Sequence, residues 1–352
     1  MKTQTRLQKP TIKDIANACG VSTATVSYVL NGKSVLRADT RERVYQAMRD
    51  MNYHPNALAR GLHTKTMRAL GIMLGTVDPS EFVVNPYTSR ILQGVVQEAR
   101  RQKFHVTLFT DDWLGADASG PSIRDGRTDG ILVVAPILGT DIMDTLPEMQ
   151  PNIVAISAPA RPFVDIVDVD DFAGGRLATE HLINLGHRRI AYLTGNSDLS
   201  SYQPRLAGYL AALDVAGIEP DNRLIVESHF DGSLAGAQTK ALLELPERPT
   251  AIFAGNDAIA FQTVSAIRDA GLSVPEDVSV VGYDDMPAAS VVTPKLTTIN
   301  QPLVEIGVTA TTMLIERIAA SESSGGLRRK AENVLLAPKL VVRDSTGPLA
   351  RR

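Results

Sequence analysis

Hydrophobic residues near the start of the chain recur at helical spacing. They fall at i, i+3, i+4 and i+7, as Ile12, Ile15, Ala16 and Cys19, which places them on one face of a short helix. Gly20 follows directly and can adopt the left-handed backbone conformation that ends many helices. The pattern predicts a helix that buries this face and stops at the glycine.

Polar residues mark the start of this helix and of a second one. Thr11 can cap the first turn together with Asp14, and Ser22 can cap the next helix. We predict that this helix buries Val26, Val29 and Leu30. The outward face of that second helix carries no charge. Its side chains are those of Thr23, Ala24, Ser27 and Tyr28.

The same apolar spacing appears a third time, at Val44, Ala47, Met48 and Met51. It predicts a third helix that closes a three-helix unit. Cys19 has apolar neighbours and no second cysteine to pair with, so we predict that it lies in the core of this unit.

The pattern changes from about Met67 onward to short apolar runs separated by helix-length amphipathic stretches. The runs are ALGIML, HVTLF, GILVV, NIVAI, DIVDV, IAYLTG, AIFAG and VSVVGY. Apolar strands that alternate with helices are typical of parallel sheets covered on both faces. This length of chain suits two such sheets better than one.

Charge is distributed unevenly along the 352 residues, although the net charge is only -3. Through residue 70 there are 12 basic residues against 4 acidic ones, whereas the remainder has 24 against 35. A basic head of +8 on an acidic body of -11 indicates a polyanionic partner for the head alone.

The single cysteine excludes a disulfide framework and a cysteine-based zinc cluster. The opening residues MKTQTRLQKPTIKD contain no apolar stretch of the kind found in signal peptides, and no later run is long enough to span a bilayer. We therefore expect a cytoplasmic protein without a metal or cofactor.

Two helices joined by a short turn, the second with a bare uncharged face, indicate a helix-turn-helix whose second helix enters the major groove of DNA. Small side chains let the helix backbone approach the base edges closely. Hydroxyls of Thr and Ser can bond to bases or phosphates, Ala24 can contact a thymine methyl, and Tyr28 reaches farther.

Two segments near the start of the chain resemble a known family. TIKDIANACGVSTATVSYVLNG, followed by NYHPNALARGL, resembles the DNA-binding head and hinge of the LacI/GalR family of bacterial transcription repressors. The resemblance covers nearly the whole chain, because DGILVV, GHRRIAYLTG, RLAGYLAAL, AIFAGNDAIA, VPEDVSVVGYDD and LTTINQP recur in the family's order.

The resemblance implies a fold and its boundaries. A small all-α helix-turn-helix head would occupy residues 1–53 and a hinge residues 54–66. An α/β core of two doubly wound parallel-sheet lobes, like those of periplasmic binding proteins, would occupy 67–345, with a tail at 346–352. The chain would cross between the lobes near residues 169, 298 and 328.

The resemblance also implies DNA contacts. Base reading falls to Thr23, Ala24 and Tyr28. The other expected contacts are Thr11, Ser22, Thr25, Ser27, Asn31, Asn56 and Ala57. The family usually has a serine cap before the third helix, where this chain has Arg37. Loss of such a cap costs on the order of 1 kcal/mol.

The hinge segment predicts a helix of roughly two turns between Pro55 and Gly61, too short to be stable alone in water. The resemblance implies that two such helices lie in the minor groove, where Leu62 wedges into a base step. From the residues alone, a flexible linker is the alternative.

In open α/β sheets, ligands bind beyond the carboxyl ends of the strands. The residues that follow strands and match the family's effector positions are Tyr87, Arg205, Phe230, Asn256, Asp257 and Asp284. Asp284 could instead cap a turn in GYDD. Ser157 departs from the acidic residue of many relatives, which leaves the effector's identity open.

These observations predict a homodimeric transcription factor that binds a roughly palindromic DNA operator, acts as a repressor, and responds to a small effector. Induction by a carbohydrate is the expected response, and a purine-type corepressor or a partner protein is the alternative. No G-x-G-x-x-G follows a predicted strand and no catalytic triad is evident, which argues against an enzyme. A periplasmic solute receptor would share the core but would carry a signal peptide and no basic head.

Overall fold

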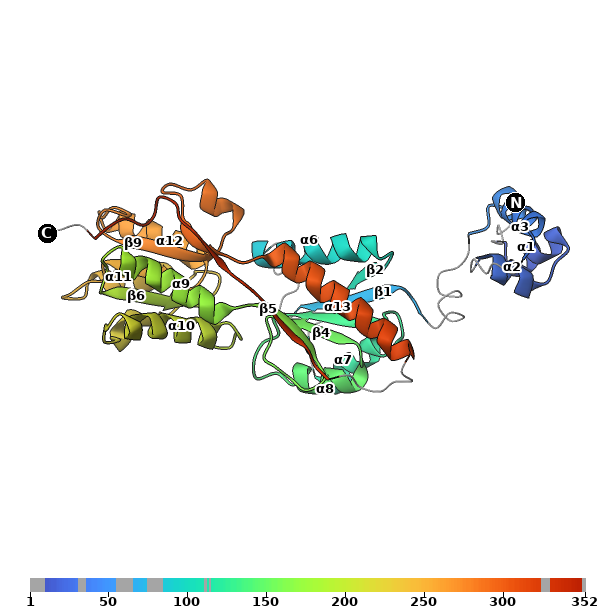
Figure 1. Ribbon diagram of the computed structural model, residues 1–352, viewed down its shortest axis with the longest axis horizontal. Coiled ribbons are helices and arrows are strands. Elements are labelled where there is room, and N and C mark those ends of the chain that lie inside the picture. The colour runs from blue at the N-terminus through green and yellow to red at the C-terminus, as the bar shows by residue number, and fades with distance from the viewer. Residues whose placement is uncertain are drawn as a thin grey trace, which may run out of the picture. The chain divides into compact units, whose positions relative to one another are not determined.

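Two units make up the chain, the head (Met1–Met67) and the core unit (Arg68–Arg352) (Figure 1). The structure is a computed structural model, and it describes residues 10–30, 36–54, 66–74, 85–110, 113, 115–323 and 330–349. The predicted residues Asn31, Asn56, Ala57 and Leu62 lie outside the described residues.

The head contains the helices α1 (Ile12–Cys19), α2 (Thr23–Leu30) and α3 (Ala38–Asp50). They enclose a small apolar core in which Ile15, Val26 and Val44 are fully buried, and Cys19 is buried with them. The three-helix unit predicted from the hydrophobic spacing is confirmed, although Leu30, which was predicted to be buried, is only half-buried.

The ends of the first two helices follow local polar signals. The Asp14 carboxylate accepts hydrogen bonds from the backbone N–H and the hydroxyl of Thr11, at 2.8 and 2.7 Å. Gly20 adopts a left-handed conformation with φ of 62°, as predicted. The hydroxyl of Ser22 accepts from the Thr25 N–H at 3.1 Å and so caps α2.

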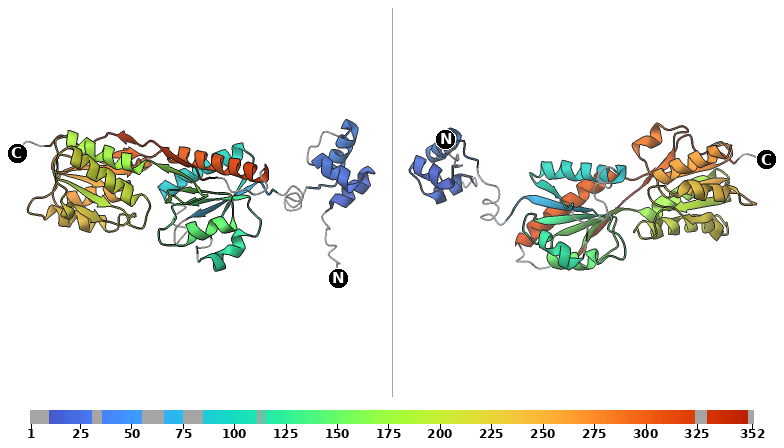
Figure 2. Two further views of the ribbon diagram at one scale, coloured as in Figure 1. Left: turned by 60° about the horizontal axis from the view of Figure 1, so that its bottom comes forward. Right: turned by 180° about the vertical axis from the view of Figure 1, so that it is seen from behind.

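The first lobe of the core unit, lobe 1, is built on a six-stranded parallel sheet in the order β11-β5-β4-β3-β1-β2. Apolar residues from alternate strand positions form one core under α6 and α13 and another under α7 and α8. Figure 2 shows helices on both faces of the sheet. The elements are β1 (Ala69–Leu74), α6 (Pro86–Arg101), β2 (His105–Leu108), α7 (Ala116–Ile123), β3 (Gly130–Val134), α8 (Ile142–Met149), β4 (Ile153–Ile156), β5 (Asp165–Val169), α13 (Leu303–Ser323) and β11 (Asn333–Leu336).

The second lobe, lobe 2, repeats this plan in the order β12-β10-β9-β8-β6-β7, with β12 antiparallel to β10. Its two apolar cores lie under α9 with α10 and under α11 with α12. The predicted pair of doubly wound lobes is confirmed. The elements are α9 (Asp171–Asn184), β6 (Ile190–Thr194), α10 (Tyr202–Val215), η1 (Asn222–Leu224), β7 (Ile225–Glu227), α11 (Ala235–Leu243), β8 (Ala251–Ala254), α12 (Asp257–Asp269), β9 (Ser279–Asp284), η2 (Pro287–Ser290), β10 (Thr297–Asn300) and β12 (Lys339–Val341).

Three passages of the chain join the lobes. The first follows Val169, as predicted, and the second leaves lobe 2 only after Asn300. The third was predicted near residue 328, which is wrong. The segment Asn333–Leu336 pairs in parallel with β5 at the edge of lobe 1, so the chain leaves this lobe between Leu336 and Lys339. Figure 1 shows this passage, in red, running beside β5.

Helices α9 and α10 of lobe 2 approach each other closely at two glycines. A Cβ on Gly175 would lie 2.3 Å from the carbonyl oxygen of Arg205, and one on Gly208 would lie 2.2 Å from that of Phe172. The helices can pack at this distance because neither glycine has a side chain.

The chain after β12 continues along lobe 2. Val280 donates its N–H to the Ser345 carbonyl at 2.8 Å, and Leu349 donates its N–H to the Leu185 carbonyl at 2.9 Å. Residues 346–349 therefore pack on lobe 2, although the sequence suggested a separate tail. Within the described residues, no helix is long and apolar enough to cross a membrane.

Candidate functional site

The outward face of α2 is bare, as the sequence predicted. Thr23 and Ala24 are exposed and Tyr28 is 43% exposed, whereas Val26 and Val29 on the opposite side are buried. Three uncharged side chains are therefore exposed on this face, and side chains of this kind can contact base edges in a groove of DNA.

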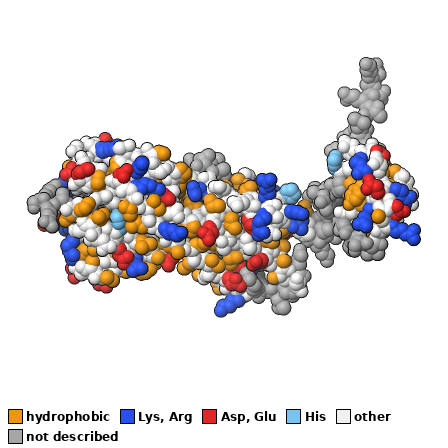
Figure 3. All heavy atoms as spheres, turned by 45° about the horizontal axis from the view of Figure 1, so that its top comes forward, with side chains coloured by type: hydrophobic (Ala, Val, Ile, Leu, Met, Phe, Trp, Pro, Cys, Tyr) orange, Lys and Arg blue, Asp and Glu red, His pale blue; other side chains and the backbone are white. Residues whose placement is uncertain are grey.

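Two other predicted contacts have local partners in the structure. The hydroxyls of Ser22 and Thr25 lie 2.9 Å apart, and Ser22 also caps α2, so both side chains help to hold the start of the helix. Arg37 begins α3 without a side-chain cap. Figure 3 shows Lys and Arg side chains on the described surface of the head.

In lobe 1, the carboxyl ends of strands bring three polar side chains together. The Tyr87 hydroxyl lies 2.5 Å from the Ser157 hydroxyl, and Ser157 donates to Asp168 Oδ1 at 2.9 Å. Asn85 fixes the start of α6 by accepting the Tyr87 N–H at 2.9 Å. Tyr87 was predicted from the sequence, whereas Asp168 was missed.

Asp168 explains the departure noted at Ser157. The neighbouring strand β5 supplies a carboxylate beside the position at which β4 ends without one. The available signal was the second aspartate of the run DIVDV, because a charged residue among buried apolar strand positions is uncommon.

Burial raises the pKa of the Tyr87 hydroxyl well above its usual range, and the nearby Asp168 carboxylate adds to the effect. Burial, together with the Asp171 carboxylate, raises the pKa of Asp168 to about 7. Tyr87 therefore stays neutral at physiological pH, while Asp168 changes its charge there.

In lobe 2, Arg205 contacts Asp171, Gly255 and Tyr283. Its Nε donates to Asp171 Oδ1 at 2.7 Å, and its Nη1 donates to the Gly255 carbonyl at 2.6 Å. The guanidinium lies 3.7 Å from the centre of the Tyr283 ring, whose hydroxyl donates to the same Asp171 oxygen at 2.8 Å. Arg205 was predicted as a ligand contact, and Asp171 and Tyr283 were missed.

Asp257 follows a strand, as predicted, but it is fully buried. It accepts hydrogen bonds from the Thr298 hydroxyl at 2.6 Å and from the Met286 N–H at 2.7 Å. Gly282 opposite leaves room for it, because a Cβ there would lie 2.3 Å from its Oδ1. Burial raises the pKa of Asp257, and the nearby Asp284 carboxylate adds to the effect. The structure gives Asp257 a role in joining β8 to β10, and ligand contact remains only a prediction.

Asp284 ends β9 with a φ of 111°, which is unusual for a residue other than glycine. Its Oδ1 accepts from the Gln301 amide at 2.5 Å, and Gln301 belongs to the second passage between the lobes. Burial raises the pKa of Asp284 to about 7, although Arg205 and the Gln301 hydrogen bond oppose this shift.

The remaining two predicted residues contact each other. The Asn256 side chain caps α12 by accepting the Ile259 N–H at 2.8 Å and donates to the Phe230 carbonyl at 2.7 Å. Phe230 is 42% exposed, so its ring can pack on the apolar face of a ligand.

The two lobes make direct hydrogen bonds at this edge. The Ser200 hydroxyl of lobe 2 donates to the Ser157 carbonyl at 2.7 Å, and the Leu138 N–H of lobe 1 donates to the Asp198 carbonyl at 2.9 Å. The predicted ligand residues of both lobes therefore lie at a shared edge, next to contacts that would change if the lobes moved apart.

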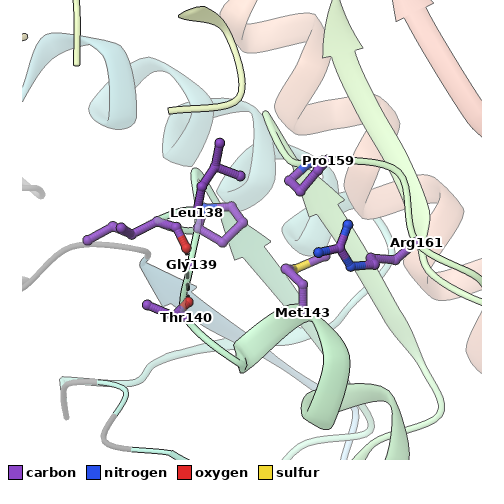
Figure 4. A pocket seen from close by; sticks show the side chains of 8 residues that line it. Leu138, Gly139, Thr140, Met143, Pro159 and Arg161 are labelled. Atoms are coloured by element: carbon purple, nitrogen blue, oxygen red, sulfur yellow. Dashed lines mark hydrogen bonds between the residues drawn. The ribbon is translucent and has the colours of Figure 1, made fainter. Parts of the chain in front are cut away.

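A small recess lies beside these contacts in lobe 1 (Figure 4). Its wall contains Leu138, Thr140, Met143, Pro159 and Arg161, and its volume is about 20 Å³. This volume suffices for about one water molecule, so the recess cannot hold a sugar or a purine. Among the described residues, no group of His, Cys, Asp and Glu is placed to hold a metal ion.

Two family models match the chain. The model described as bacterial regulatory proteins, lacI family, matches residues 11–56, and a periplasmic binding protein-like domain matches residues 179–346. The first match covers the helix-turn-helix, and the second covers most of lobe 2.

Relatives and solved structures match over nearly the whole chain. The HTH-type transcriptional repressor PurR of Mannheimia succiniciproducens is 32% identical and the alignment covers 97% of this chain and 99% of the relative. The HTH-type transcriptional regulator DegA of Bacillus subtilis is also 32% identical, with the same coverage. The lac repressor dimer bound to operator and the anti-inducer ONPF superposes with a TM-score of 0.82 at 30% identity, covering 97% of this chain and 100% of that one. A complex of the transcriptional regulator CelR with cellobiose gives a TM-score of 0.73 at 30% identity, covering 96% and 99%.

Proposed function

Because this chain belongs to the LacI family of bacterial regulatory proteins, we propose that it is a homodimeric repressor controlled by a small molecule bound between its two lobes. Its relatives are transcriptional regulators, so the chain is a DNA-binding transcriptional repressor and not an enzyme. The operator, the effector and the assembly are the parts that we propose.

The bare face of α2 carries the proposal for DNA reading. Thr23, Ala24 and Tyr28 would contact base edges in the major groove, while the Lys and Arg residues of the head hold the phosphates. A helix-turn-helix dimer reads two half-sites, so the operator should be roughly palindromic. Asn31, Asn56, Ala57 and Leu62 remain predicted contacts outside the described residues.

The strand-end side chains support an effector site in the core unit. Tyr87, Arg205 and Asp284 come from both lobes, and Phe230 offers an apolar ring beside them. Hydroxyl-rich ligands suit such a mixture of acceptors and one aromatic face. We infer a carbohydrate inducer, which is also supported by the similar structures of CelR with cellobiose and of an Enterococcus faecium regulator with ribose.

A purine-type corepressor is the second candidate. The likeness to several repressors named PurR, at 32 to 34% identity, favours it. A ligand that tightens operator binding would support the corepressor, and one that weakens it would support the inducer.

Control by the effector requires a difference in ligand affinity between two states of the core unit. The hydrogen bonds between Ser200 and Ser157 and between Leu138 and Asp198 exist only while the lobes are close. An effector that contacts both lobes would favour this state over an open one, and the hinge segments of a dimer would transmit the difference to the operator.

The first experiment selects the operator from random DNA with the purified full chain and then measures affinity by fluorescence anisotropy. We expect a palindromic site, and we expect Tyr28→Ala to weaken binding to it by about 1–3 kcal/mol while leaving binding to random DNA almost unchanged. Tyr45→Ala is a matched control, because Tyr45 is 41% exposed on α3 whereas Tyr28 is 43% exposed on α2. Equal losses on both DNAs would contradict base reading by Tyr28.

The second experiment adds sugars and purines one at a time to the complex with the selected operator. We expect at least one compound to change operator affinity and to bind the protein in calorimetry. If no compound of either class did so, small-molecule control would be contradicted.

A further inference from the structure

Acidic side chains dominate the edge at which the two lobes meet. Asp168 lies in β5 and Asp171 begins α9, on either side of the first passage between the lobes. Asp284 ends β9, and Asp257 and Asp285 lie close to it. Carboxyl groups therefore outnumber basic groups along this edge.

Three arginines of the described residues near this edge form ion pairs with carboxylates. Arg205 is paired with Asp171, and the two side chains are only 11% and 5% exposed. Arg343 is paired with Asp285 at 2.6 Å. In lobe 1, Arg161 is paired with Asp144 at 2.7 Å. An anionic ligand would find no unpaired positive charge on these three arginines.

The hydrogen bonds in lobe 1 leave acceptors toward a ligand. Ser157 has one hydroxyl hydrogen and donates it to Asp168, so Tyr87 must be the donor in its own contact with Ser157. The Tyr87 oxygen then retains only acceptor capacity. Both hydrogen bonds to Asp168 end on Oδ1, and among the described residues none ends on its Oδ2.

Gln301 gives an independent indication of a missing donor. It is 2% exposed, and its amide nitrogen donates to Asp284, yet its carbonyl oxygen has no hydrogen-bond partner. Buried side-chain oxygens nearly always have a partner, and each exception calls for an explanation. A donor group on a bound molecule beside Asp284 would satisfy this oxygen.

The protonation of Asp168 and Asp284 also favours a ligand that donates hydrogen bonds. Burial raises the pKa of both Asp168 and Asp284 to about 7, with the Asp171 carboxylate raising both further and Arg205 opposing. Tyr87 and Tyr283, the other titratable groups that face them, stay neutral because burial raises the pKa of both hydroxyls. Each of the two carboxyls can therefore release a proton when a donor or a cation binds near neutral pH.

We propose that this edge is a charge filter: it takes a small molecule that presents hydrogen-bond donors to Asp168, Asp284 and Gln301, uncharged or cationic, and it rejects sugar phosphates and other anions. The proposal rests on the effector site proposed above and specifies the class of ligand. It names Asp168 and Gln301, which the sequence did not indicate, as residues that determine ligand specificity.

The carboxyls can be tested in the full chain without a ligand. We expect two aspartate side-chain signals in ¹³C NMR to titrate near pH 7, one lost in Asp168→Asn and the other in Asp284→Asn. Asp214→Asn, which removes an exposed carboxylate on α10, should remove neither. Titration of both assigned groups near pH 4, the usual range for aspartate, would contradict proton release by these carboxyls when a ligand binds.

Matched ligands test the filter itself. Glucose, galactose and ribose are each compared with their terminal phosphate esters by calorimetry and by the change in melting temperature. We expect at least a tenfold preference for one uncharged parent over its phosphate, and we expect this preference to shrink in Asp168→Asn, which keeps the shape and removes the charge.

The two proposals fail in different ways. A phosphate ester that binds more tightly than its parent sugar would overturn the filter, although effector control would stand. A parent sugar that is preferred over its phosphate and yet leaves operator affinity unchanged would support the filter and contradict effector control.

Discussion

The substitution Arg205→Ala tests what stabilises the part of lobe 2 that carries the predicted ligand residues. Arg205→Ala leaves the Asp171 carboxylate, with a side chain only 5% exposed, without its counter-charge. We expect the free energy of unfolding of the core unit to fall by about 3–5 kcal/mol, because an unpaired buried charge retains its desolvation penalty and loses its attraction.

The magnitude follows from the geometry of the pair. At 2.7 Å and an effective dielectric constant of about 20, two unit charges attract each other by about 6 kcal/mol. Desolvation of both groups offsets much of this attraction in the wild type. The variant also loses the contact of the guanidinium with the Tyr283 ring, which contributes about 1–2 kcal/mol in a desolvated setting.

Urea unfolding followed by circular dichroism measures the loss, and a second substitution identifies its cause. Asp171→Asn in the Arg205→Ala background removes the unpaired charge while its side-chain oxygen can still accept from Tyr283. We expect this double variant to be more stable than Arg205→Ala alone by about 1–3 kcal/mol. A double variant less stable than Arg205→Ala would refute the reasoning, since the loss would then not come from a stranded carboxylate.

Three further predictions concern pH, helix packing and the hinge. The pKa of Asp168 is about 7 in the folded chain and near 4 in the unfolded chain, so the free energy of unfolding falls as the pH rises from 4 to 7. Asp168→Asn should make this fall less steep, by up to about 1.4 kcal/mol per pH unit, in urea unfolding measured at several pH values. Gly208→Ala forces a Cβ to within 2.2 Å of the Phe172 carbonyl and should cost about 1–3 kcal/mol, whereas Gly236→Ala, with nothing within 4 Å, should be neutral or stabilising in the same assay. Leu62→Ala should reduce operator affinity and DNA bending together, and an unchanged bend angle at saturation would exclude a wedge.

Local signals made the head predictable. The Thr11 and Ser22 caps, the left-handed Gly20 and the apolar spacing all depend on residues within about one helical turn of each other. Such signals can be read from a linear sequence because the partners lie nearby in the chain. The same holds for the apolar runs that became β1, β3 and β9.

The sequence did not predict which residues far apart in the chain contact each other in the core unit. Tyr283 and Asp171 are 112 residues apart, and Tyr87 and Ser157 are 70 apart, yet each pair shares a hydrogen bond. Nothing in the spacing or polarity of these residues indicates that they meet. Strand β11 was missed for a related reason, since its four residues become a strand only by pairing with β5.

The rule that ligands bind beyond strand ends predicts the edge of the sheet but not the depth of a side chain. Phe230 and Asp257 both lie beyond strand ends on this edge, yet Phe230 is 42% exposed and Asp257 is fully buried. The difference comes from a neighbouring strand, where Gly282 has no Cβ to fill the space that the Asp257 carboxylate enters. Two donors on distant segments, the Thr298 hydroxyl and the Met286 N–H, then hold it there. A carboxylate with both oxygens occupied has little left to offer a ligand, whereas Asp168 keeps one oxygen without a donor among the described residues. Ligand binding at this edge should therefore depend more on Asp168 than on Asp257.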